Sequence, residues 1–141
     1  MFTDKASVQS VLIAFVGYLV VATIAMIIVV QRWMPAGVTD KQELARLAEL
    51  DPSLLMWQSV LGSILCIAAG FAVCHFSGAK GLKNSLLLGA LLVFYGALGI
   101  LLHPDHPPLM QAAKLLAPIP LALLGGWLRL RFASHAVVAI D

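Results

Sequence analysis

Four long apolar stretches constrain this chain more than any other feature of its sequence. Residues 11–30, 54–76 and 86–102 contain no Asp, Glu, Lys or Arg, and residues 109–128 contain a single lysine. A helix needs roughly 17–25 apolar residues to cross a bilayer, and a segment in lipid satisfies its own backbone hydrogen bonds only as a helix. The sequence therefore predicts an all-α, polytopic membrane protein: one domain over residues 1–141, with four transmembrane helices in a small antiparallel bundle.

The composition agrees with a chain that is surrounded by lipid. The chain is 61% hydrophobic and 11% charged, whereas soluble domains are about 25% charged. So few polar residues cannot cover the apolar mass with a hydrated surface, and the lipid bilayer is the expected environment. The net charge is only +2, and the basic residues stand singly rather than in a patch. The sequence therefore predicts no nucleic-acid partner.

The basic residues outside the apolar stretches predict an orientation. With four crossings, both termini and the middle connection share one side of the membrane, which carries five basic residues against three on the other. Because basic residues favour the inner side, we expect both termini in the cytoplasm of a multi-pass cell-membrane protein, in a bacterial inner membrane. The five are Lys5, Lys80, Lys83, Arg129 and Arg131, and the three are Arg32, Lys41 and Arg46.

The first connection is long enough to hold a further helix. Asp40 stands three residues before Glu43, a pattern typical of a helix start. Leu44 and Leu47 then recur at helical spacing on one side. The pattern predicts a short amphipathic helix over residues 40–50, at the outer membrane–water interface or over the mouth of the bundle. Its acidic polar face fits either a solvated cap or a docking surface.

Small residues share one face of each apolar stretch. Helices in membranes associate where small side chains let their backbones approach. On the third stretch, several glycines fall within one arc at 100° per residue, and this face also suits contact with a second chain. The residues predicted to pack helices together are Gly62, Cys66, Gly89, Gly96 and Gly99.

Lys114 is the strongest candidate for a ligand-binding residue. It is the one Lys, Arg, Asp or Glu inside a predicted span, and such groups are costly and often functional. Pro118 and Pro120 follow it, and prolines free helix carbonyls by removing their donors. A cation beside a broken helix is suited to an anionic head group or substrate. The alternative is that Lys114 reaches the outer interface or pairs with Asp105.

A turn rich in histidine and proline offers a candidate metal site. His103, Asp105 and His106 carry the imidazole and carboxylate ligands that zinc accepts. Their spacing is not a recognised metal motif, and a polar turn at the interface is the alternative. A haem needs axial ligands at similar depth, whereas His75 and His103 stand at opposite ends of their spans. No cofactor is therefore expected.

Two functions fit these features. The first is a non-enzymatic accessory, assembly or stabilising subunit of a larger membrane complex, with other membrane chains or a second copy as partner. The alternative is a small oligomeric transporter or lipid-handling protein that uses Lys114 and the break at Pro118 and Pro120. An enzyme is less favoured, because the sequence shows no phosphate-binding glycine loop, nucleophile elbow or metalloprotease helix.

Overall fold

The computed structural model describes residues 5–34, 36–37, 39–102 and 108–138. The described chain is helical and contains no strand, which confirms the predicted all-helical fold class. The elements are α1 (Lys5–Trp33), α2 (Lys41–Leu50), α3 (Pro52–Ser77), the short 3-10 helix η1 (Gly78–Lys80), α4 (Gly81–Leu102), α5 (Pro108–Leu116) and α6 (Pro118–Val138).

Three of these helices are long and apolar enough to cross a membrane. They cover Val8–Trp33 in α1, Pro52–Ser77 in α3 and Gly81–Leu102 in α4, with mean hydropathies of 2.8, 2.0 and 2.3. The first three predicted spans lie within them. These helices support a multi-pass membrane protein, because each presents a long apolar surface and satisfies its own backbone.

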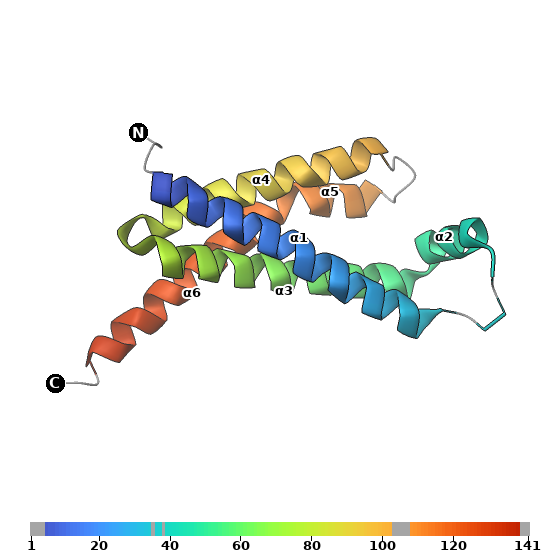
Figure 1. Cartoon of the computed structure of the whole chain (residues 1–141), viewed down its shortest axis with the longest axis horizontal. Coiled ribbons are helices and arrows are strands. Elements are labelled where there is room, and N and C mark those ends of the chain that lie inside the picture. The colour runs from blue at the N-terminus through green and yellow to red at the C-terminus, as the bar shows by residue number, and fades with distance from the viewer. Residues whose placement is uncertain (1–4, 35, 38, 103–107, 139–141) are drawn as a thin grey trace.

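The long helices lie along one another in Figure 1. The N-terminal helix α1 runs beside α3. Helix α2 lies beyond one end of this pair, the end opposite to both chain termini. Helix α5 packs on α4, and together they form a second pair at that end. Helix α6 packs against both α3 and α4, then extends away from the other helices towards the C-terminus.

The fourth apolar stretch, residues 109–128, is divided between α5 and α6. The two helices meet at Ala117, whose N–H donates to the Ala113 carbonyl at 3.0 Å and whose carbonyl accepts from Leu121 N–H at 3.1 Å. The next residue, Pro118, has no N–H to continue the ladder, and its fixed φ suits the first position of a new helix. A fourth crossing therefore stays a prediction, since neither part alone matches the length and composition of α1, α3 and α4.

Close backbone contacts hold α6 against α3 and α4. A Cβ atom on Gly70 would lie 2.8 Å from the Ala122 Cα, and one on Gly126 would lie 2.6 Å from the Ser85 Oγ. The Ser85 hydroxyl is fully buried and lies within 3.0 Å of the carbonyl oxygens of both Gly70 and Gly81. This junction places small residues where three helices converge, as expected where backbones approach within a membrane.

Asp51 connects the far ends of α1, α2 and α3. Its carboxylate accepts the Trp33 indole N–H at 2.6 Å and caps α3 by accepting the Ser53 N–H at 2.8 Å. The Ser53 hydroxyl also donates to it at 2.6 Å. The hydrogen bonds from Ser53, and then from Trp33, lower the pKa of Asp51 from 3.8 to about 2. At the other end of α2, Asp40 caps the helix by accepting the Gln42 N–H at 3.0 Å.

Candidate functional site

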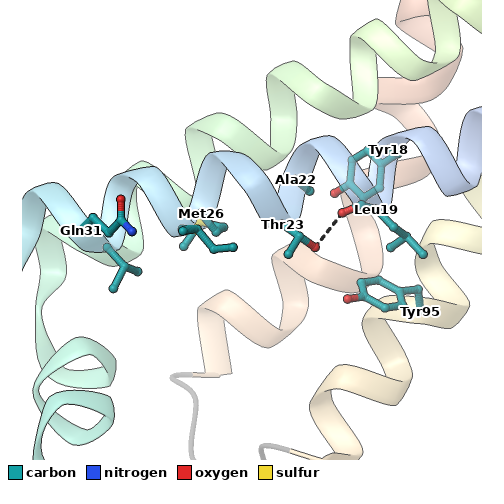
Figure 2. Close-up of a pocket in the computed structure, with 9 residues that line it drawn as sticks. Tyr18, Leu19, Ala22, Thr23, Met26, Gln31 and Tyr95 are labelled. Carbon is teal, nitrogen blue, oxygen red and sulfur yellow. Dashed lines mark hydrogen bonds between the residues drawn. The ribbon is translucent and has the colours of Figure 1, made fainter. Parts of the chain in front are cut away.

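Polar side chains of the apolar helices gather at a groove between α1 and α4. The groove has a volume of about 470 Å³ and follows one face of α1 from Tyr18 to Gln31, with Tyr95 on its other wall. Figure 2 shows Tyr18, Thr23 and Tyr95 close together at one end and Gln31 at the other. The Thr23 hydroxyl donates to the Leu19 carbonyl at 2.7 Å and is satisfied within its own helix. Most of the remaining lining is apolar.

Tyr18 and its neighbours connect α1 to α3 and α4. The Tyr18 side chain packs against the buried cluster that contains Cys66 of α3. On the α4 side, the rings of Phe15 and Tyr95 meet edge to face, with centroids 6.3 Å apart and planes at 81°. Cys66, which the sequence predicts to pack helices, therefore lies at the contact between α1 and α3.

A second groove separates α1 from α3 on another face of α1. It has a volume of about 590 Å³, and small residues line both of its walls. They are Ala14 and Gly17 on α1, and Ala68, Ala69 and Ala72 on α3.

Lys114 lies on α5, where this short helix packs against α4. A Cβ atom on Gly96 would lie 2.8 Å from the Lys114 carbonyl oxygen. In an uninterrupted helix this oxygen accepts from residue 118, but Pro118 has no N–H. At the proline break, the Lys114 carbonyl therefore lacks its helical donor and lies close to the backbone of α4. The Lys114 side chain is half-buried and lines neither of the two grooves.

The predicted packing glycines differ in their surroundings. Gly89 and Gly96 lie at close contacts, because a Cβ on Gly89 would be 2.9 Å from the Ile119 Cα and one on Gly96 would meet Lys114. Around Gly62 and Gly99, an added Cβ would meet no described atom within 4 Å.

A basic pair joins α3 to α6 at the end of the bundle where η1 lies. Arg129 Nε donates to His75 Nδ1 at 2.9 Å, although the two residues are 54 positions apart in the chain. The His75 ring also meets the Phe76 ring edge to face, with centroids 5.1 Å apart. The sequence places His75 at a helix end and Arg129 just after the last predicted span, and it contains no signal that would pair them.

The candidate metal ligands His103, Asp105 and His106 lie outside the described residues. Within the described ranges, no group of three His, Cys, Asp or Glu side chains is placed to hold a metal ion. Comparison with protein-family models, curated proteins and solved structures found no match to this chain.

Proposed function

We propose that this protein is a non-enzymatic accessory, assembly or stabilising subunit of a larger membrane complex. In this proposal it crosses a bacterial inner membrane four times as an antiparallel bundle, and α5 and α6 together form the last crossing. Helix α2 lies at the outer interface as an amphipathic helix, and both termini are cytoplasmic. The positions of the basic residues support this orientation, and the three long apolar helices support the membrane location.

The groove between α1 and α3 carries the proposal that the chain binds a partner. Glycine costs a helix about 1 kcal/mol relative to alanine, so a glycine in the middle of α1 calls for a compensating contact. An added Cβ on Gly17 would meet no described atom within 4 Å. Gly17 lines the α1–α3 groove together with alanines, and small residues of this kind let another transmembrane helix approach closely. We infer that this groove receives a helix of a partner chain.

Replacing Gly17 with leucine tests this proposal directly. Because an added Cβ meets no described atom within 4 Å and the groove beside Gly17 is open, Gly17→Leu should leave the thermal stability of the isolated protein unchanged or raise it slightly. The leucine would hold a partner helix away from the groove. Purification in a mild detergent should therefore yield one stoichiometric membrane partner with the wild type and none with the variant.

A matched control is available on the outer face of α4. Ala90 is exposed and lines neither groove, so Ala90→Leu adds a similar volume without entering the proposed interface. It should retain the partner. If the wild type purifies with no stoichiometric partner, or if Gly17→Leu keeps the partner as well as Ala90→Leu does, the proposal is wrong.

The second candidate function is small-molecule transport or lipid handling at Lys114 by an oligomer of this chain. The observation that favours it is the bend at Ala117. Pro118 and Pro120 have no N–H, so the carbonyls of Lys114 and Leu116 lack their helical donors. The Lys114 side chain lies within two turns of both carbonyls. A cation and carbonyls that lack their helical donors at one helix break are suited to a polar ligand within a membrane. The Lys114→Met variant described below separates the two functions.

A further inference from the structure

The hydrogen bond between Arg129 and His75 fixes the donors that this pair presents. In this hydrogen bond His75 Nδ1 is the acceptor, so the ring N–H that this arrangement leaves as a donor is the one on Nε2. The Arg129 guanidinium has five N–H donors, and this contact uses only the one on Nε. The two terminal nitrogens of Arg129 and Nε2 of His75 remain, and all of them are donors. A pair that presents donors and no acceptor matches an anion.

The surrounding charges favour the same kind of ligand. Lys80 and Lys83 are exposed at this end of the bundle, in η1 and the first turn of α4. Every acidic side chain that the structure describes lies at the opposite end, around α2. These acidic residues are Asp40, Glu43 and Asp51.

The Arg129–His75 pair lies where the membrane surface is expected. His75 stands in the last turn of α3, where the apolar helix Pro52–Ser77 ends. The neighbouring Phe76 is 76% exposed and contacts the His75 ring, so an apolar surface lies directly beside the donors. On α6, Arg131 lies over the ring of Trp127, 5.2 Å from its centroid, and tryptophan is enriched where membrane helices meet the head groups. A soluble anion would gain nothing from this apolar surface.

We propose that Arg129 and His75 form a binding site for the phosphate group of an anionic phospholipid. The planar guanidinium donates two parallel hydrogen bonds to phosphate oxygens, and His75 holds the guanidinium in place while adding its own donor from Nε2. The acyl chains then lie along Phe76 and the exposed side of α3. The donors of this site are separate from Lys114, which lies on α5. Phe76 also lines the groove between α1 and α3, so the acyl chains and a partner helix in that groove would meet at Phe76.

Native mass spectrometry of the delipidated full-length protein tests this site. The protein is titrated with phosphatidylglycerol, with phosphatidylcholine of the same acyl chains, and with inorganic phosphate. A basic residue near an anionic membrane surface contributes about 1 kcal/mol, so Arg129→Gln should weaken phosphatidylglycerol binding about fivefold and leave phosphatidylcholine unchanged. His75→Gln should weaken it to a smaller extent. Arg129→Lys should restore only part of the loss, because lysine keeps the charge without the planar pair of donors.

The control variant is Arg32→Gln, which removes one exposed arginine from the last turn of α1 and should not change phosphatidylglycerol binding. Melting temperatures in lipid-free detergent show which variants are folded, and His75→Gln provides the test if Arg129→Gln does not fold. The site is refuted if the folded Arg129 or His75 variant binds phosphatidylglycerol as the wild type does. It is also refuted if Arg32→Gln causes an equal loss, if phosphatidylcholine binds as tightly as phosphatidylglycerol, or if millimolar inorganic phosphate displaces the lipid.

Discussion

Replacing Gly125 with alanine tests the packing of α6 against α3 with a single methyl group. The added Cβ would overlap the carbonyl oxygen of Ile67 and would lie 2.8 Å from the backbone nitrogen of Phe71. Both are backbone atoms of α3, so no change of rotamer relieves the overlap and the two helices must separate. Overpacking costs about 1–3 kcal/mol, and alanine returns up to about 1 kcal/mol of helix propensity. A backbone overlap belongs at the upper end of the overpacking range. We therefore expect the free energy of unfolding to fall by about 2 kcal/mol.

Reversible unfolding in one detergent, followed by circular dichroism, measures this loss. The matched control is Gly17→Ala, which adds the same methyl group to α1 where it would meet no described atom within 4 Å. It should leave the free energy of unfolding unchanged or raise it slightly, because only the gain in helix propensity remains. If Gly125→Ala is as stable as the wild type, or if Gly17→Ala is destabilised equally, α6 does not contact α3 in the way described.

Three further changes test other contacts. Gly96→Leu should lower the melting temperature in detergent, because the side chain would displace α5 at the Lys114 carbonyl; an unchanged melting temperature would show that α5 does not pack there. Lys114→Met should fold with equal or greater stability and keep the same anionic lipid adducts in native mass spectra, since a charge at a helix centre costs about 2.5–3.5 kcal/mol and less near an end; loss of a bound head group would favour the lipid-handling alternative. The lowered pKa of Asp51, about 2 against 3.8, means that this carboxylate stabilises the fold above about pH 4 and loses that contribution as the pH falls through about 2. Asp51→Asn should therefore show a smaller drop in melting temperature between these pH values, and an equal drop would contradict a stabilising role of the Asp51 carboxylate and its hydrogen bonds from Ser53 and Trp33.

The apolar stretches predicted most of the helices, because in a membrane length and hydropathy decide which segments become helical. The spans predicted at 11–30, 54–76 and 86–102 lie within α1, α3 and α4. The helix in the first connection was also readable from the sequence, since the Asp40 side chain that suggested its start does cap α2. Pro118 likewise indicated the break, because it cannot continue the hydrogen-bond ladder.

Other features depend on how distant segments meet, which hydropathy does not record. Gly89 and Gly99 belong to one predicted face of α4, yet a Cβ on Gly89 would contact α6, whereas one on Gly99 would meet no described atom within 4 Å. The 100° period places residues on an arc but does not say which neighbour covers it or how far the contact extends. The last predicted span ended at residue 128, where charged residues begin, but α6 continues to Val138. A helix does not have to end where its apolar sequence ends, and the pairing of Arg129 with His75 follows from that continuation.

The central claim is that the chain crosses the membrane four times, with α5 and α6 completing the last crossing. Fusions of a reporter that is active only in the cytoplasm, placed after Gly37, after Lys80 and after Asp141 of the full chain, test it most directly. The expected result is activity after Lys80 and Asp141 and silence after Gly37, with all three fusions well expressed. The claim is contradicted if Lys80 and Asp141 report opposite sides, because α5 and α6 then do not return the chain across the membrane.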